Sequence, residues 1–358
     1  MLSRLKLDPF LVALAAAVIL ALAWPAPGVS GGPLHADKAA SWGVAVIFFL
    51  YGVSLSARRL LESATRWKLH LVVQLATFAL FPAVVALVMP LLGRVLPEAL
   101  CIGFFFLAAL PSTVSSSVAM TSLARGNVPV AIFNASISSI IGVFVTPLLM
   151  AWYLHAAGDG LDLQGVILKL VLMVILPLAV GQLLRPLLLR LVERHRSLVR
   201  AADRTVILAI VYNSFCDSVA AGVWKGQSPL LLVEIVACVL LLFAAVYVIV
   251  QLACRLLGFA EADTTAVVFC ASKKSLATGL PMAHVMFGAA PELSLIITPI
   301  MIYHFLQLVI VGVIAGRSAA RADMLAALAA EETEPSLLAE EEAEPQLSRT
   351  AAGTHLSA

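Results

Sequence analysis

The sequence predicts an all-α polytopic membrane protein with ten transmembrane helices in two inverted five-helix repeats. Three observations predict this class. The 358 residues are 61% hydrophobic and 12% charged, whereas a soluble domain has roughly 25% charged residues. Ten apolar runs are long enough to cross a bilayer. The basic residues also fall mainly on one side of these crossings.

The apolar runs define the predicted spans, and short connections between them favour one compact bundle. We expect a transporter domain over 1–318, with one repeat at about 5–156 and the other at about 162–318. The remaining residues, 319–358, are acidic and contain no aromatic side chain, which predicts a largely disordered cytoplasmic tail. The ten spans are 9–24, 39–56, 69–91, 98–122, 128–155, 165–189, 203–223, 229–256, 264–287 and 292–315.

The basic residues predict the orientation of the chain. Ten crossings return it to its starting side, and cytoplasmic loops are enriched in Lys and Arg. Both termini are therefore expected in the cytoplasm, with the protein in a plasma or inner membrane. The opposite side holds at most Lys38, Arg94, Lys169 and Lys225. The starting side holds Arg4, Lys6, Arg58, Arg59, Arg66, Lys68, Arg125, Arg185, Arg190, Arg194, Arg196, Arg200, Arg204, Arg255, Arg317 and Arg321.

Composition also argues against several other classes. The five cysteines lie in apolar runs without a CxxC pair, so we interpret them as core residues rather than metal ligands or disulfides. The absence of HExxH and GxSxG motifs argues against an enzyme, although the Ser272-Lys273 pair resembles an activated hydroxyl. No cofactor is expected. The predicted partners are the lipid bilayer and a small solute rather than a nucleic acid, and the oligomeric state stays open.

Short segments of the first half of the sequence recur in the second half. The segment Phe144–Tyr153 resembles Ile296–Phe305, and each contains a Thr-Pro pair. Two further matches follow in the same order at similar offsets. Because five spans are an odd number, such copies must be inverted in the membrane, as in many secondary transporters. The further matches pair Tyr51 with Tyr212 and Ser112 with Ser272.

Polar residues interrupt the fourth span. Pro111 follows ten apolar or small residues, removes an amide donor and disturbs the helix. Backbone groups freed at membrane depth need hydroxyls, water or a ligand as partners. A serine-rich surface for helix packing is the alternative interpretation. The candidate binding residues are Ser112, Thr113, Ser115, Ser116 and Ser117.

The ninth span is interrupted by the sequence SKKS. Each lysine would cost roughly 2.5–3.5 kcal/mol at the centre of a lipid-facing helix. Lys273 and Lys274 must therefore face a cavity, a counter-charge or the bundle interior, and about 100° separates successive helical residues. The two ammonium groups are thus predicted to have different roles. Ser272 and Ser275 complete this second set of candidates.

Other polar residues have weaker claims. Asp217 is the clearest carboxylate within a span, and Asn213 lies one helical turn before it. Our hypothesis places both in the same polar interior as the lysines; the alternative is a solvated position at the end of the span. Asn134 in the fifth span is a further candidate. His284 and His304 are interpreted as core histidines.

The two interrupted segments carry a family resemblance. The stretches LPSTVSSSVAMTSLARGNVPVAIFNAS and CASKKSLATGLPMA resemble the bile acid:sodium symporter family, especially its divergent P7-type branch and related bacterial proteins. The resemblance covers about 5–316. It implies that a panel domain (helices 1, 2, 6 and 7) moves against a core domain (helices 3–5 and 8–10). It also implies that helices 4 and 9 are broken and cross where sodium and substrate bind.

The resemblance implies a sodium site, but the residues depart from it. The family's Ser-Asn pair falls near Ser116, Ser117 and Val118, without the asparagine. Its helix 5 ligands fall near Ala131 and Ala135, where Asn134 alone could compensate. Lysines replace the acidic residue and glutamine of helix 9. Two positive charges about 4 Å apart repel by about 4 kcal/mol at an effective dielectric near 20, so a lysine opposes Na⁺ and can take its place.

These features predict a secondary transporter that moves a small organic anion by alternating access. Sodium is the coupling ion that the resemblance implies, and the lysines argue against it. Because a buried lysine can release and take up a proton, proton coupling is an alternative. A membrane regulator that keeps the transporter fold without moving solute is the other alternative.

Overall fold

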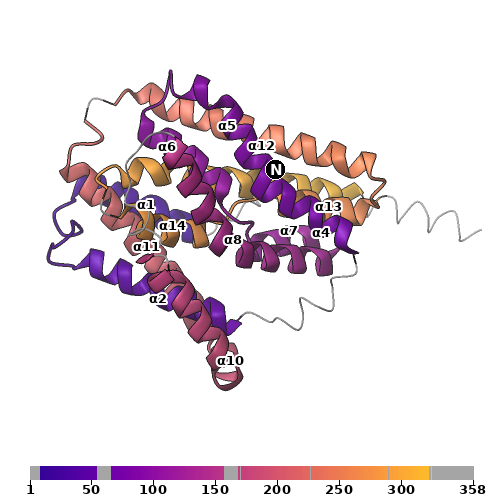
Figure 1. Cartoon of the computed structure of the whole chain (residues 1–358), viewed down its shortest axis with the longest axis horizontal. Helices are drawn as coiled ribbons and strands as arrows, with labels where there is room; N and C mark the ends of the chain where they lie inside the picture. Colours follow the sequence, from indigo (N-terminus) through magenta and orange to yellow (C-terminus); the bar gives the residue numbers. More distant parts are fainter. Residues whose placement is uncertain are drawn as a thin grey trace, which may run out of the picture.

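The computed structural model describes residues 9–54, 66–156, 168–169, 171–225, 227–288, 290–321 and 324. Within these ranges all regular secondary structure is helical (Figure 1). The first half contains α1 (Pro9–Ala23), α2 (Ala36–Ser54), α4 (Trp67–Leu75), the π-helical turn η3 (Ala76–Leu80), α5 (Phe81–Leu92), α6 (Glu98–Ala109), α7 (Ser115–Leu123) and α8 (Val128–Ala156). The second half contains η4 (Val171–Ile175), α10 (Leu176–Arg194), α11 (Arg196–Ala220), α12 (Pro229–Leu256), α13 (Glu261–Ala271), α14 (Leu276–Phe287) and a last helix, Leu293–Arg321.

Every predicted span coincides with helical structure, although fewer helices qualify as spans by length alone. Six helices in the described ranges are long and apolar enough to cross a membrane. The predicted fourth and ninth spans are each divided into two shorter helices, α6–α7 and α13–α14. The apolar part of α1 is also short, and the N-terminal half of α11 is polar. The tail beyond 324 lies outside the described residues.

Apolar side chains cover much of the outer surface. Leu87, Leu183 and Leu187 are 82%, 79% and 76% exposed, in helices that carry further exposed leucines and valines. A soluble monomer rarely exposes large contiguous apolar patches. Hydrocarbon is the solvent that accommodates such a surface, which agrees with an integral membrane protein.

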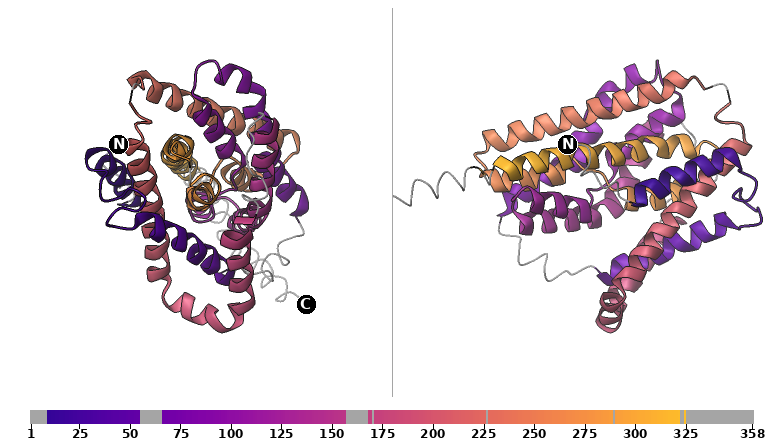
Figure 2. Two further views of the ribbon diagram at one scale, coloured as in Figure 1. Left: turned by 60° about the vertical axis from the view of Figure 1, so that its left-hand side comes forward. Right: turned by 180° about the vertical axis from the view of Figure 1, so that it is seen from behind.

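The helices form two groups. The four-helix group consists of α1, α2, α10 with the η4 turn that leads into it, and α11; the larger group contains the remaining described helices. Figures 1 and 2 show α10 projecting from the body of the molecule with α2 beside it. The main contacts between the groups are made by α14, which packs against α2 and α11.

Glycines allow α2 and α10 to approach closely. A Cβ atom at Gly52 would lie 2.1 Å from the carbonyl oxygen of Leu178, and one at Gly181 would lie 2.1 Å from that of Phe49. Small residues at a helix contact let two backbones come together in a membrane, where packing replaces the hydrophobic effect as the driving force. The reciprocal pair therefore fixes the spacing of these two helices.

Candidate functional site

Two non-helical segments meet inside the larger group. The segment 110–114 separates α6 from α7, and 272–275 separates α13 from α14. The backbone N–H of Ser275 donates to the carbonyl oxygen of Pro111 at 2.9 Å. The hydroxyl of Ser112 donates to the carbonyl oxygen of Cys270 at 2.6 Å. These bonds join residues more than 150 positions apart and create one junction, made of 110–117 and 269–275.

Lys274 occupies the interior of the junction. Its Nζ atom donates to the carbonyl oxygens of Thr77, Ala108 and Leu110 at 2.8, 2.7 and 2.7 Å, and it lies 4.1 Å from the centroid of the Phe81 ring. Ala108 and Leu110 stand at the C-terminal end of α6, where carbonyl groups lack helical partners and the helix dipole favours a cation. The ammonium group thus caps a helix that ends inside the protein.

The backbone of Lys274 is held equally firmly. Its N–H donates to Oε1 of Gln307 at 2.8 Å, and Nε2 of Gln307 donates to its carbonyl oxygen at 2.9 Å. Gln307 is fully buried and also lies 2.9 Å from Nδ1 of His304. One amide side chain therefore satisfies both backbone groups of a residue that belongs to no helix.

Lys273 points to a different part of the junction. Its Nζ atom donates to the carbonyl oxygen of Ser116 at 2.8 Å and lies 6.0 Å from the centroid of the Phe269 ring. Both lysines are fully buried. In the part of the chain that the structure describes, neither ammonium group contacts a carboxylate. In the described residues, the partners of the two Nζ atoms are carbonyl oxygens and aromatic faces.

Hydroxyl groups satisfy other carbonyl groups around the junction. The hydroxyl of Tyr303 donates to Ser272 at 2.7 Å, and that of Thr146 donates to Ala109 at 2.7 Å. The hydroxyl of Ser117 donates to Phe269 at 3.4 Å. Such partners are what interrupted backbone requires at membrane depth.

The amide side of the junction is bound in the same way. The N–H of Ser112 donates to the hydroxyl of Ser138 at 3.0 Å. Ser275 caps α14, because its hydroxyl accepts from the N–H of Thr278 at 3.2 Å. The hydroxyl of Ser272, the C-cap residue of α13, donates to the carbonyl oxygen of Val268 in that helix at 2.7 Å.

One edge of the junction is accessible. Val114 and Ser115 are exposed, and Ser116 is half-buried. The hydroxyls of Thr113 and Ser116 are hydrogen-bonded to each other. Because Ser116 also accepts from Lys273, this edge lies next to the ammonium group of that residue.

The structure does not bring all predicted site residues to the junction. Asp217 does not pair with the lysines: its carboxylate accepts from the N–H and hydroxyl of Ser30 at 2.7 and 2.6 Å and from Asn213 at 3.2 Å. These contacts tie α11 to the loop after α1, at the end of the span. The side-chain N–H of Asn134 donates to the carbonyl oxygen of Val130 in the same helix, and both oxygen atoms of Asn134 accept from the amide of Gln74.

Sequence reasoning missed the residues that hold the lysines. Gln307 and Tyr303 lie in the last helix, and Thr77 contributes only a backbone carbonyl group. A glutamine in an apolar span is a signal that would have identified Gln307. No pattern identifies the carbonyl group of Thr77.

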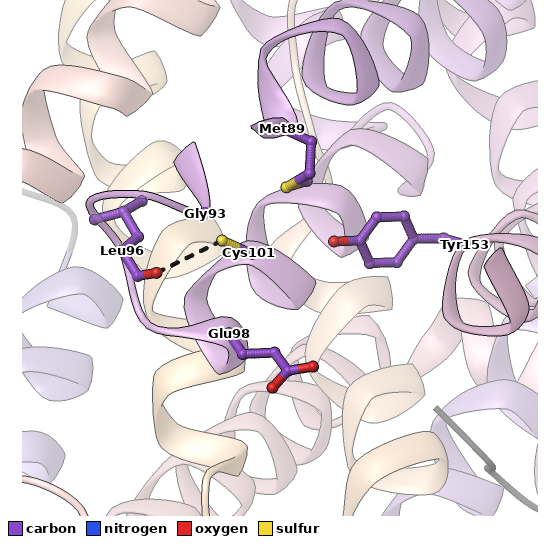
Figure 3. Close-up of a pocket in the computed structure, with 6 residues that line it drawn as sticks. All are labelled: Met89, Gly93, Leu96, Glu98, Cys101 and Tyr153. Atoms are coloured by element: carbon purple, nitrogen blue, oxygen red, sulfur yellow. Dashed lines mark hydrogen bonds between the residues drawn. The ribbon is translucent and has the colours of Figure 1, made fainter. Parts of the chain in front are cut away.

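A separate pocket lies away from the junction (Figure 3). Met89, Gly93, Leu96, Glu98, Cys101 and Tyr153 line it. Figure 3 shows the hydroxyl end of Tyr153 directed into the pocket, whereas the thiol of Cys101 turns toward the carbonyl oxygen of Leu96, to which it donates at 3.9 Å. None of the predicted site residues lines this pocket.

Comparison with known proteins agrees with the architecture. The model of the SBF-like CPA transporter family matches residues 8–320. The Pseudomonas aeruginosa protein "Uncharacterized protein PA2026" is 39% identical over 324 residues, which cover 90% of this chain and 96% of that protein. "Putative symporter YfeH" of Escherichia coli K12 is 37% identical over 325 residues, 90% of this chain and 96% of its own.

The similarity extends to animal proteins. "Sodium/bile acid cotransporter 7" of Mus musculus is 33% identical over 326 residues, which cover 88% of this chain and 93% of that protein. The matches span nearly the whole lengths of both chains, so they concern the complete helical bundle. The prediction that the protein is a transporter rather than an enzyme is confirmed. The chain belongs to the SBF-like CPA transporter family.

Proposed function

We propose that this protein moves a small organic anion across the membrane by alternating access, with Lys274 standing permanently where a coupling cation would bind. The observation that carries this proposal is the coordination of Lys274. Three backbone carbonyl oxygens surround its ammonium group at 2.7–2.8 Å. Carbonyl oxygens are the ligands of a hard cation, and the tethered ammonium group uses them all.

The proposal includes the number of spans, their arrangement in repeats and their orientation in the membrane. The described helices make ten spans in two inverted repeats, about 5–156 and 162–318, with both termini in the cytoplasm. The fourth and ninth spans are broken at the junction. The four-helix group acts as the panel and the larger group as the core. The outer end of the molecule is then the end that holds the 24–35 loop, because an odd number of crossings precedes it.

An anionic substrate follows from the charges at the accessible edge. Lys273 lies beside that edge without a carboxylate partner in the described ranges. The helices α7 and α14 both begin at the junction, so the positive ends of their dipoles lie there. We place the substrate against Ser115 and Ser116, between panel and core, with Thr113 alongside. Asn134, Asn213 and Asp217 then shape the surroundings rather than bind substrate.

The bile acid in the name of the mouse relative supplies a first probe. Purified protein in proteoliposomes is loaded with unlabelled taurocholate or a smaller carboxylate, and entry of the radiolabelled anion is measured in Na⁺ and in choline. We expect equal exchange in both salts. Lys273→Ala lowers exchange at least tenfold, whereas Lys225→Ala, at an exposed lysine, leaves it unchanged.

The tethered-cation part has its own test. Lys274→Ala removes the ammonium group and leaves three carbonyl oxygens that Na⁺ can bind. We expect Na⁺, but not choline, to raise the melting temperature of Lys274→Ala protein and to leave wild type unaffected. Exchange that requires Na⁺ in wild type and survives Lys274→Ala would contradict the proposal. If wild type moves none of the anions, the regulator alternative gains support.

A further inference from the structure

A second polar contact lies where the panel meets the core. α14 packs against α2 and α11, and in the proposed topology this contact lies toward the outer end. The hydroxyl of Ser41 in α2 lies 3.1 Å from Nε2 of His284 in α14. This hydrogen bond joins the two groups of helices that alternating access must separate. Nothing in the lysine junction involves either residue.

Two buried polar atoms beside this contact lack partners in the described residues. They are Nδ1 of His284 and Oδ1 of Asp37, and both are inaccessible to solvent. Asp37 lies one turn outward from Ser41 on the same face of α2. A Cβ atom at Gly288, one turn outward from His284, would lie 3.4 Å from Nδ1. The unpartnered nitrogen and the unpartnered oxygen therefore lie on the same, outward side of the Ser41–His284 bond.

Negative charge surrounds the imidazole from both neighbouring helices. Burial disfavours the charged form of His284, and the negative charges of Asp217 in α11 and Asp37 in α2 oppose this effect of burial. Ser30 and Asn213 hold the Asp217 carboxylate in place. A neutral imidazole leaves one buried acceptor or donor unused, which is costly. An imidazolium ion carries an N–H on both nitrogens and offsets one of the two negative charges.

We propose that His284, with Asp37 and Asp217, is a proton-binding site that joins the panel to the core at the outer end. The ligand that we propose is a proton; the described residues contain no group of three His, Cys, Asp or Glu side chains placed to hold a metal ion. The inference deepens the proposed function, on whose panel and core it rests, by assigning the coupling ion.

Binding at an interface makes the proton a part of the transport cycle. When the outer end is closed, α2 and α11 bring their carboxylates to His284, so the protonated ring is stabilised. Opening the outer end separates α14 from α2 and releases the proton to water. By linkage, a proton that binds the closed state more tightly must also favour closure.

The experiment measures the outer end directly. Full-length protein in nanodiscs carries spin labels at Leu34→Cys on the panel and Val95→Cys on the core, both exposed positions. Four of the native cysteines are buried, and the partly buried Cys238 is replaced by serine. Distances between the labels are measured by electron–electron resonance from pH 5 to pH 9. We expect a short-distance population that decreases as the pH rises.

Three variants test whether His284 is the group that titrates. His284→Gln loses the pH dependence. Asp37→Asn, which keeps the shape of the side chain, moves the midpoint to a lower pH. His155→Gln, at an exposed histidine, leaves the curve unchanged. Wild type without pH dependence, or a curve retained in His284→Gln or unmoved in Asp37→Asn, overturns the proposal. The readout needs no transported anion, so it can fail while anion exchange succeeds, and the reverse.

Discussion

Adjacent lysines in this protein have different neighbours because successive backbone positions point in different directions. Lys274 turns inward to three carbonyl groups and an aromatic ring, whereas Lys273 turns toward one carbonyl group at the accessible edge. A buried ammonium group without partners costs several kcal/mol. The partners of Lys274 compensate for burial more fully than the single carbonyl partner of Lys273 does.

This difference predicts unequal losses of stability. Lys274→Met removes three charge-assisted hydrogen bonds and leaves their acceptors buried, so we expect it to lower the free energy of unfolding by at least about 3 kcal/mol. Lys273→Met removes one such bond, and we expect a loss of about 1.5–3 kcal/mol. Steric-trapping measurements in bicelles compare the two. A larger loss for Lys273→Met would contradict the assignment.

Ser112 offers a second measurement on a single residue. Ser112→Ala removes the bond to Cys270 that joins the two interruptions, and we expect an unfolding free energy lower by about 1–3 kcal/mol because the acceptor is buried. The control is Ser139→Ala, whose hydroxyl donates to the carbonyl oxygen of Ala135 in its own helix. Equal losses of unfolding free energy in the two variants would show that the bond between the segments stabilises the protein no more than a bond within one helix.

At the scale of the elements, the sequence predicts where helices end better than it predicts which residues the helix ends contact. Pro111 with its hydroxyl residues, and the SKKS stretch, predict two interruptions, and the structure ends α6 and α13 just before these stretches. The sequence does not predict that the two interruptions supply each other's hydrogen-bond partners, since Ser112 and Cys270 are 158 residues apart. It also does not predict the π-helical turns η3 and η4, each directly before a helix with proline at its start. Proline lacks the N–H that the regular register needs.

The contact between α2 and α10 gives a prediction at this scale. Gly52→Ala and Gly181→Ala each place a methyl group against a backbone carbonyl group that cannot move away, and overpacking of this kind costs about 1–3 kcal/mol. Gly312→Ala is the matched control in the last helix, where the nearest atom would lie 3.9 Å away. Thermal unfolding followed by size-exclusion chromatography compares the three. A stable Gly52→Ala protein would mean that the helices can separate at no cost.

For the whole molecule, hydrophobicity and basic residues predict the number and direction of the crossings, because both follow from the bilayer as solvent. The packing of the four-helix group against the larger group depends on contacts between residues far apart in the sequence. Asp217 illustrates this: its span suggested a partner for the lysines, but its carboxylate binds Ser30, 187 residues away. A carboxylate in a span predicts only that a partner exists.

The orientation can be tested on the intact protein. Val95→Cys, between α5 and α6, should react with a membrane-impermeant maleimide in right-side-out vesicles. Ser197→Cys, in the first turn of α11, should react only after the vesicles are opened. Both positions are exposed, so accessibility to the reagent depends on the side of the membrane. The reverse pattern would contradict the cytoplasmic placement of the termini.

The tether of Lys274 has an electrical consequence. An ion that is covalently part of the chain cannot be carried through and released, so a transported monovalent anion would cross as one uncompensated negative charge. A membrane potential of 100 mV, negative inside, changes the free energy of that step by about 2.3 kcal/mol and drives the anion outward. A proton travelling with the anion cancels this current. In a voltage-clamped proteoliposome, a current that accompanies anion movement therefore indicates an exporter driven by voltage, whereas anion uptake without a current indicates an importer driven by acid outside.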